Sequence, residues 1–368
     1  MIRVLHVVSS MPRAGLENAL MNYYRHIDRN EIQFDFLMAK KERGDFDDEI
    51  ESLGGKIYRI PMSNPLNYIK DLNKFFRKHR EYTVCHVHHI PWGALSILLA
   101  KFNGVPTRIS HVHFAKSPSR ALSAKSLMKW ISRRFANRYF ACGHVAGQNF
   151  FGKKIVEGPD FMIIKNAIDT ERFCYDETVR RSLREKLGIA PDDFVIGHVA
   201  RMTPVKNHKF TIDILHNLKS LKGTGKYKCI FVGDGPLRKE IEDYATEKGV
   251  ATECVFTGSV GDTQAYFQAM DYLIFPSLAE GLGLVVIEAQ AAGLKCIAST
   301  GVPEESRLSD LVDFLPLEIG ALKWAEFVLE NGKYERQSRL SEVKQAGYDI
   351  KSTVMELEKL YRQLSYSG

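Results

Sequence analysis

The sequence predicts an α/β fold with two domains, each a parallel sheet that is doubly wound by helices. Short apolar segments with strand character alternate with helix-length amphipathic segments along almost the whole chain, and such repeats form parallel sheets with helices on both faces. The chain has 368 residues, which is long for one core and suits two. A polar stretch at residues 166–193 interrupts the pattern and is predicted as the linker region.

The predicted strands fall into two groups on either side of this stretch. The first group is Arg3–Val8, Gln33–Met38, Val84–His89, Arg108–Val112 and Tyr139–Cys142, and the second is Val195–Val199, Lys228–Val232, Cys254–Phe256, Tyr272–Phe275 and Lys295–Ala298. We expect domains at residues 1–170 and 171–348, with a C-terminal helix at 349–368 that packs back on the first domain. Because such sheets bind ligands at the carboxyl ends of their strands, the expected site is the cleft between the domains.

Composition excludes several classes of protein. The content of 45% hydrophobic and 26% charged residues is ordinary for a soluble globular protein. No apolar run approaches the roughly 18 residues that span a bilayer, and no signal peptide is recognisable. The six cysteines include no CxxC pair, which favours a reducing cytoplasm over a disulfide framework.

Positive charge is concentrated in the first half of the chain. Residues 1–165 hold 26 Lys and Arg against 14 Asp and Glu, a net charge of +12, whereas the remainder carries −5. Lys116–Arg138 is predicted as a basic amphipathic helix, in which Lys125, Lys129 and Arg133 recur at intervals of four and Leu127, Trp130, Ile131 and Phe135 form an apolar stripe. A basic excess attracts phosphate-rich partners such as nucleic acid, anionic lipid or a polyphosphate substrate. For the helix we expect contact with an anionic membrane, and the alternative is a solvated helix packed on its own domain.

The strongest chemical signal is the segment Ser277–Gly293, which follows a predicted strand. Gly281 and Gly283 let backbone N–H groups approach a ligand at a helix start, which is a ready anion site. Glu280 in the loop and Glu288 in the helix are carboxylates that accept hydrogen bonds from sugar hydroxyls. The alternative is an acidic residue that favours the helix dipole, with a second Glu on the surface.

A second signal follows the strand Val195–Val199. Its loop presents Arg201 and Lys206, and Asn207 is placed to cap the next helix. Two cations beside a helix start suit a diphosphate, and the alternative is a pair of solvated loop charges.

Taken together, these motifs resemble the retaining glycosyltransferases of family 4, especially the branch that builds capsule, exopolysaccharide and O-antigen. Glu280 and Glu288 match the family's E-x7-E motif, Val232–Leu237 matches its VGxGP turn, and Ile163–Asp169 matches its I-x-N-G-[IV]-D segment with Ala167 in place of the glycine. The resemblance covers nearly the whole chain. It implies the GT-B fold, in which two Rossmann-like domains face a central cleft.

The resemblance also implies roles for individual residues. Arg201 and Lys206 would bind the donor diphosphate, Glu280 the hydroxyls of the transferred sugar, and Glu288 the ribose. The donor-binding set further includes Gly15, Gly233, Val260, Gly281, Leu282 and Gly283. Val260 would offer its backbone to the base, and Gly233 would shape the nearby wall.

Two features of the first half depart from the family or leave a choice. The family commonly has two glycines after the first strand, where this chain has Ala14 and Gly15, so phosphate contact rests on the N–H of Gly15. The family's histidine near the donor sugar is best matched by His113, with His111 as the second choice. His86, His88 and His89 alternate or adjoin on a strand without an acidic partner nearby, so no metal site is predicted.

The predicted activity is transfer of a sugar from a nucleotide-diphosphate-sugar, by expectation a UDP-sugar, to a glycan or lipid-linked glycan. The catalytic set is His113, Glu280, Arg201 and Lys206. We expect retention of the anomeric configuration, no metal or other cofactor, no nucleic-acid partner, and a cytoplasmic location on the inner face of the membrane. The alternatives are a sugar-nucleotide 2-epimerase and a non-catalytic glycan- or nucleotide-binding scaffold.

Overall fold

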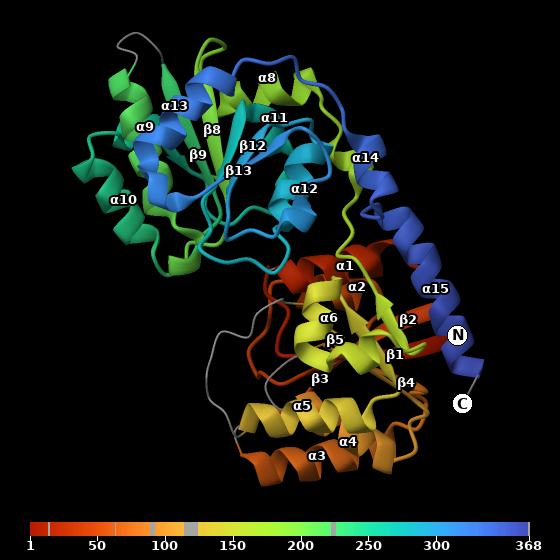
Figure 1. The fold of residues 1–368 in the computed structure, drawn as a ribbon. Helices are drawn as coiled ribbons and strands as arrows, with labels where there is room; N and C mark the ends of the chain where they lie inside the picture. Colours follow the sequence, from red (N-terminus) through yellow and green to blue (C-terminus); the bar gives the residue numbers. More distant parts are fainter. Residues whose placement is uncertain (14, 63, 89–92, 114–123, 222–225, 367–368) are drawn as a thin grey trace. The chain divides into compact units, whose positions relative to one another are not determined.

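The structure is a computed structural model that describes residues 1–13, 15–62, 64–88, 93–113, 124–221 and 226–366. Its internal contacts divide the chain into two compact units, which Figure 1 colours along the sequence. Unit 1 comprises Met1–Ile168 together with Asp349–Gly368, and unit 2 comprises Asp169–Tyr348. The sequence placed these limits at residues 170 and 348.

Unit 1 is built on a parallel sheet with the strand order β3-β2-β1-β4-β5-β6-β7 in the described part of the chain. Its strands are β1 (Ile2–Val8), β2 (Ile32–Met38), β3 (Ile57–Arg59), β4 (Val84–His88), β5 (Thr107–Val112), β6 (Arg138–Ala141) and β7 (Phe161–Ile163). The order reverses between β1 and β4, the kind of position at which doubly wound sheets bind ligands.

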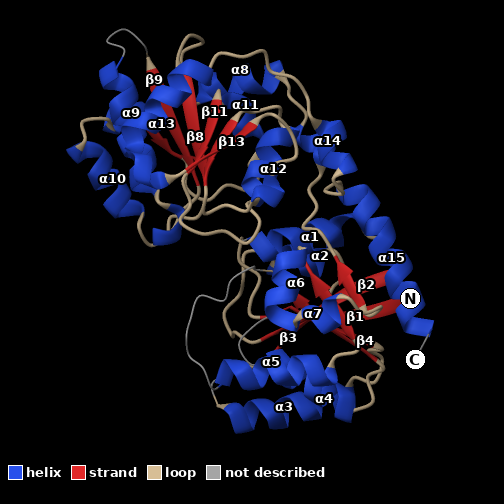
Figure 2. Cartoon of the chain, viewed as in Figure 1, coloured by secondary structure: helices blue, strands red, loops and turns tan. Residues whose placement is uncertain are grey.

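Helices cover both faces of this sheet, as Figure 2 shows. They are α1 (Gly15–His26), α2 (Asp47–Ser52), α3 (Pro65–Lys78), α4 (Gly93–Phe102), α5 (Ala124–Phe135), α6 (His144–Phe151), α7 (Lys153–Val156) and α15 (Ile350–Tyr366). One core joins α1, α2 and α15 to the sheet face that carries Val4 and Val84, and another joins α3, α4 and α5 to the face that carries Leu5 and Cys85.

Helix α15 belongs to unit 1 because its apolar residues repeat at the helical period. Ile350, Val354, Leu357, Tyr361 and Leu364 recur at steps of four and three, and all are buried in the core beside α1. The hydroxyl of Thr107 on β5 donates to the carbonyl of Leu364 across 3.0 Å. The last helix of the chain is therefore part of the core of the first unit.

Unit 2 is built on a second parallel sheet, with the described strands in the order β10-β9-β8-β11-β12-β13. These are β8 (Phe194–Val199), β9 (Tyr227–Val232), β10 (Cys254–Phe256), β11 (Tyr272–Phe275), β12 (Cys296–Ser299) and β13 (Val312–Leu315). The order reverses between β8 and β11, so the loops that follow these two strands flank the switch point.

The helices of unit 2 enclose a core around the fully buried Trp324. The α-helices are α8 (Glu177–Lys186), α9 (His208–Leu221), α10 (Arg238–Glu247), α11 (Gln264–Ala269), α12 (Leu284–Ala291), α13 (Gly320–Asn331) and α14 (Leu340–Gln345). Short 3-10 turns are η1 (Thr170–Phe173), η2 (Pro204–Lys206), η3 (Ala251–Glu253), η4 (Glu304–Ser306) and η5 (Leu317–Ile319). None of the described helices has the combined length and apolar character needed to cross a bilayer.

The predicted fold class is confirmed: two α/β units with parallel, doubly wound sheets. The ten strands proposed from the sequence all occur, with ends that shift by a residue or so, and residue 89 lies outside the described residues. The structure adds the strands β3, β7 and β13, which are only three or four residues long.

The predicted basic helix at Lys116–Arg138 is partly wrong. Residues 114–123 lie outside the described residues, α5 ends at Phe135, and Arg138 begins β6. The chain leaves the helix because the N–H of Asn137 bonds to the carbonyl of Arg108 on the neighbouring strand at 3.0 Å.

Only part of the predicted apolar stripe of α5 is buried. Ile131 is buried in the core, whereas Leu127 and Trp130 are 52% and 56% exposed. Two of its cations are engaged within unit 1, because Lys129 donates to the carbonyl of Asn149 and Arg133 to that of Phe150 near the end of α6. Such contacts satisfy carbonyls that have no partner within a helix end.

Candidate active site

The loop that carries Arg201 and Lys206 follows β8 and is held against the turn that follows β9. The N–H of Ala200 bonds to the carbonyl of Val232, and the N–H of Met202 bonds to that of Asp234, each at 2.9 Å. Gly233 has a φ of +133°, and a Cβ there would lie 2.2 Å from the carbonyl oxygen of Ala200. The glycine therefore shapes the wall beside the loop, since any larger residue would push the two loops apart.

Lys206 meets Glu280 although 74 residues separate them in the sequence. The ammonium of Lys206 lies 2.5 Å from a carboxylate oxygen of Glu280, and both side chains are largely buried. The pair forms because their loops follow the neighbouring strands β8 and β11, and the N–H of Leu278 donates to the carbonyl of Val205 at 2.8 Å. The ammonium also lies 5.2 Å from the ring centre of Phe275. A cation and a carboxylate are thus fixed together at the switch point of unit 2.

Arg201 supplies a second cation on the same loop. Its side chain is exposed, and no carboxylate pairs with it within the described ranges. An unpaired guanidinium beside an ion pair suits an incoming diphosphate, to which it can donate two parallel hydrogen bonds.

The glycine-rich segment that follows β11 ends in a helix start. Gly283 caps α12 in the left-handed conformation, with φ +82° and ψ +52°, and a Cβ there would meet Val302 at 2.7 Å. Leu282 is buried, and Gly281 is half-buried. Because the first N–H groups of a helix have no partner within it, this start of α12 is suited to binding an anion.

Glu288 lies in α12 about two turns beyond Glu280. Its side chain is half-buried, and burial raises the pKa of the carboxyl from 4.5 to about 8. No hydrogen bond or ion pair of this carboxyl occurs among the described residues. A half-buried acid without a cation partner can exchange hydrogen bonds with a hydroxyl-rich ligand.

Val260 lies on the loop that follows β10. The N–H of Gly233 bonds to the carbonyl of Gly258 at 3.0 Å, which ties this loop to the wall that Gly233 forms. Val260 itself is half-buried, two residues beyond this contact. The backbone of Val260 is therefore on a loop fixed to the same edge of the sheet as Arg201.

Gly15 and His113 belong to unit 1. Gly15 begins α1, directly after the loop that follows β1, and a Cβ there would meet nothing within 4 Å. Ala14 lies outside the described residues, and Glu17 occupies the first turn of α1. His113 follows β5, and its Nε2 lies 2.9 Å from the Nδ1 of His88. His111, the second choice, is fully buried and hydrogen-bonds to His86 at 3.0 Å.

The contacts that hold Glu280 in place could not be predicted from the sequence. The N–H of Glu280 donates to the carbonyl of Gly301, and the hydroxyl of Ser299 donates to the carbonyl of Ser277. A Cβ on Gly301 would lie 2.5 Å from the carbonyl oxygen of Leu278. The only sequence signal was a glycine two residues beyond a strand, which by itself predicts a turn and no site.

Comparison with known proteins places these residues in a family. Residues 179–307 match the family model described as glycosyl transferases group 1, a range that includes Arg201, Lys206, Glu280 and Glu288. The chain is 33% identical over 370 residues to EpsF of Bacillus subtilis (strain 168), a protein named as a glycosyltransferase, and the match covers 98% of this chain and 96% of that one. The chain belongs to the group 1 glycosyltransferases.

Two further matches extend along most of the glycosyltransferase. An Escherichia coli enzyme named UDP-Gal:alpha-D-GlcNAc-diphosphoundecaprenol alpha-1,3-galactosyltransferase is 26% identical over 309 residues, covering 81% of this chain and 79% of that one. The crystal structure of Anabaena HepE in complex with UDP superposes with a TM-score of 0.79 and 19% identity, covering 99% of this chain and 100% of the other. This second likeness shows the fold, which is the predicted GT-B fold.

Proposed function

We propose that this glycosyltransferase moves a sugar, with retention of its anomeric configuration, from a UDP-sugar to a lipid-linked glycan in bacterial surface polysaccharide biosynthesis. The observation that carries the proposal is the ion pair of Lys206 and Glu280 at the switch point of unit 2. Lys206 is proposed to bind the donor diphosphate, and Glu280 the hydroxyls of the transferred sugar.

The nucleotide is assigned from the chemistry of the site and from two relatives. Arg201, Lys206 and the start of α12 offer positive charge and N–H groups to a diphosphate. Glu288 is proposed for the ribose hydroxyls and the backbone of Val260 for the base. UDP is the expected nucleotide because HepE was crystallised with it and the E. coli relative is named for a UDP-sugar.

Retention is proposed because the residues assigned to the donor stabilise a leaving group. An inverting reaction needs a general base opposite the leaving diphosphate. Arg201, Lys206 and the helix start instead neutralise the diphosphate as it departs. An oxygen of that diphosphate then accepts the proton of the acceptor hydroxyl, and attack comes from the same face. Since side chains supply this positive charge, no metal is required.

His113 and the N–H of Gly15 are proposed as the contribution of unit 1 to the donor. Gly15 would offer its N–H at the start of α1, where the helix dipole also favours a phosphate. His113 would hydrogen-bond to the transferred sugar, as the family resemblance implies.

The acceptor is proposed to be lipid-linked, reached from the cytoplasmic side of an anionic membrane. The surface assigned to this contact is the outer side of α4 and α5, where Phe102, Leu127 and Trp130 are exposed. Lys101 lies 5.1 Å from the ring centre of Phe135, which places a cation beside these apolar groups. Apolar side chains beside cations are typical of helices that lie on anionic membranes.

A panel of UDP-, ADP- and GDP-sugars, tested first by thermal shift, identifies the donor because a bound ligand stabilises the folded state. Incubation with that donor, with and without an undecaprenyl-diphosphate-linked sugar, is then followed by proton NMR. We expect transfer to the acceptor, slow hydrolysis without it, an α-linked product from an α-linked donor, and full activity in the presence of EDTA.

The same spectra distinguish the alternatives. A 2-epimerase would change the configuration at C2 of the sugar, and a scaffold would bind the donor without consuming it. A β-linked product would contradict retention, and loss of activity with EDTA would contradict metal independence. Binding of nucleic acid in place of a nucleotide-sugar would contradict the proposal as a whole.

A further inference from the structure

The β8 loop of unit 2, residues 200–207, carries Arg201 and Lys206 and is flanked by two histidines that contact each other. His198 is the last residue but one of β8, and His208 is the first residue of α9. Their rings stack face to face, with ring centres 4.0 Å apart and planes inclined by 5°. His198 is fully buried, and only 3% of His208 is exposed. The two ends of the loop are therefore joined by a buried contact between side chains.

A hydrogen bond strengthens the attachment of His198 to α9. Nδ1 of His198 lies 2.8 Å from the hydroxyl oxygen of Thr211, three residues further along α9 than His208. Residues three apart on a helix lie on the same face. One face of α9 therefore holds the ring of His198 both by stacking and by a hydrogen bond.

The chain reaches His208 through a residue in the left-handed conformation. Asn207 has φ +56° and ψ +46°, and it is the only residue other than glycine with a positive φ in the described part of the chain. This conformation is unfavourable for a residue with a Cβ and persists where the surrounding contacts hold it. The stack of His208 on His198 is such a contact, because it fixes the residue that directly follows Asn207.

Both rings are neutral at pH 7, which allows them to stack without repulsion. Burial lowers the pKa of His208 from 6.5 to about 4. Burial also lowers the pKa of His198 well below 6.5, and the neighbouring His208 and Lys206 lower it further. The backbone of Ala200 opposes the shift of His208, although neither nitrogen of that ring makes a hydrogen bond within the described residues. The ring of His208 is therefore held by packing and not through its nitrogens.

The stack is linked to the cation that is proposed to bind the diphosphate. Along the chain, Lys206 precedes His208 by two residues. Through space, the ring of Phe275 lies 6.4 Å from that of His198, and the ammonium of Lys206 lies 5.2 Å from the centre of the Phe275 ring. The same ammonium is paired with Glu280. Both the backbone and the side chain of Lys206 are therefore connected to the stacked histidines.

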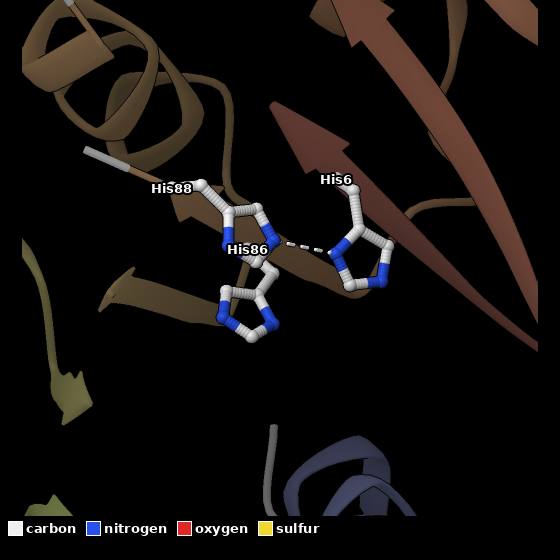
Figure 3. A group of neighbouring side chains, drawn as sticks. All are labelled: His6, His86 and His88. Atoms are coloured by element: carbon white, nitrogen blue, oxygen red, sulfur yellow. Dashed lines mark hydrogen bonds between the residues drawn. The ribbon is translucent and has the colours of Figure 1, made fainter. Parts of the chain in front are cut away.

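The buried histidines of unit 1 are arranged differently. Nδ1 of His6 lies 2.9 Å from Nε2 of His88, and His86 lies beside His88, as Figure 3 shows. Burial lowers the pKa of His6 to about 3 and that of His88 well below 6.5, so these rings are neutral as well. They connect the neighbouring strands β1 and β4, whereas His198 and His208 connect the two ends of one loop.

We propose that His198 and His208 are positioning residues, whose stack closes the β8 loop and holds Lys206 in place for the donor diphosphate. The inference rests on the proposed function, which assigns the diphosphate to this loop. A loop that is ordered before its ligand arrives loses less conformational freedom on binding. The stack is therefore expected to raise the affinity for the donor, although both rings are buried.

The test uses variants that separate the ring of His208 from its nitrogens. His208→Phe keeps a ring for the stack and loses no hydrogen bond, because neither nitrogen of His208 makes one within the described residues. His208→Ala removes the ring, and His208→Val replaces this variant if His208→Ala does not fold. Phe210→Ala is the matched control, because Phe210 lies on the same helix but pairs with Trp324 in the core, with ring centres 5.3 Å apart.

Two measurements on the folded variants report on the loop. In calorimetric titrations, we expect the affinity for UDP to fall about threefold to tenfold in His208→Ala, in line with the energy of an aromatic pair, and to stay at the native value in His208→Phe and Phe210→Ala. The amides of Ala200 and Met202 bond to carbonyls of the turn that follows β9. Their hydrogen exchange should become faster in His208→Ala but not in the other two variants.

A double-mutant cycle shows whether the stack acts through Lys206. His208→Ala should weaken UDP binding much less in the Lys206→Ala protein than in the native protein. Native affinity in His208→Ala would overturn the proposal, as would an equal loss in His208→Phe or Phe210→Ala, or full additivity with Lys206→Ala. If the native protein does not bind UDP, the proposed function fails, while the exchange of the two amides still decides whether the stack holds the loop.

Discussion

The polar side chains at the switch points of the two sheets differ in charge: those of unit 2 are ionised, and those of unit 1 are neutral. Beside β8 and β11 of unit 2, Lys206 and Glu280 are both charged and paired at 2.5 Å, with Arg201 exposed nearby. Beside β1 and β4 of unit 1, the polar groups are buried neutral imidazoles joined to one another. The same topological position therefore serves two chemistries. Charges at the edge of unit 2 suit a diphosphate, whereas each neutral imidazole of unit 1 offers one donor and one acceptor nitrogen.

The backbone differs between the two regions as well. Unit 2 holds its loops in contact through Gly233, whose missing side chain leaves room for the carbonyl of Ala200. In unit 1, Gly15 begins a helix where a Cβ would meet nothing within 4 Å. The loop of unit 2 is thus fixed by close packing, whereas the start of α1 leaves space that a ligand can occupy.

The largest expected effect is a difference in stability between substitutions at Gly233 and at Gly15. Gly233→Ala should lower the free energy of unfolding by about 3 kcal/mol or more, because it adds a severe clash to a φ that L residues rarely adopt. Gly249→Ala is the control, since Gly249 also has a positive φ of +69° but open space around it, and should cost about 1 kcal/mol. Gly15→Ala should change stability by less than about 0.5 kcal/mol. Urea unfolding measures the free energy of unfolding of the three variants. Equal losses of this free energy would contradict the close packing of unit 2.

A second prediction concerns Glu288 of unit 2. The carboxyl of Glu288 holds its proton up to a pH of about 8 in the folded protein, but only to about 4.5 in the unfolded chain. Its contribution to stability is therefore fully present below pH 4.5 and is lost as the pH rises towards 8, by at most about 1.4 kcal/mol per pH unit. Glu288→Gln should remove this dependence of the free energy of unfolding on pH. Urea unfolding between pH 5 and 8 provides the measurement, and the same slope in both proteins would show that Glu288 ionises normally.

The sequence predicted most of the residues that flank the switch point of unit 2, because they belong to local motifs. The cations of the β8 loop, the glycines of the α12 start and the two glutamates can all be read from short segments with known periodicity. The pairing of Lys206 with Glu280 could not be read in this way, since it depends on which strands are neighbours in the sheet.

The contact between His6 and His88 in unit 1 shows the same limit more strongly. His86 and His88 were visible as an alternating pair, but His6 is distant in sequence and belongs to an ordinary apolar strand. Only the register of β1 with β4 brings it to His88. The end of α5 was similarly misjudged, because the bond from Asn137 to β5 overrides a continuing helical pattern of charge.

A smaller effect is expected at the surface of α4 and α5. Binding to vesicles that contain phosphatidylglycerol should fall with salt, and Trp130→Ser with Leu127→Ser should weaken it further. Lys101→Gln and Arg134→Gln should each cost about 1 kcal/mol of binding at low salt. Lys239→Gln on α10 of unit 2 is the control, because it removes an exposed cation from the unit that is not assigned to the membrane. Co-sedimentation measures binding, and equal binding to neutral vesicles, or none to either, would contradict the assignment.

Calorimetric titration with UDP tests whether the β8 loop of unit 2 binds the donor diphosphate, as proposed. Lys206→Ala and Arg201→Ala should each remove a charge-assisted contact and weaken UDP binding by roughly 1.5–3 kcal/mol, which is about tenfold or more. Lys209→Ala is the matched control, because Lys209 lies three residues further on and forms its own 2.7 Å ion pair with Glu240. We expect the Lys209→Ala variant to bind UDP with the same affinity as the native protein. Unchanged UDP affinity in both Lys206→Ala and Arg201→Ala would contradict the account.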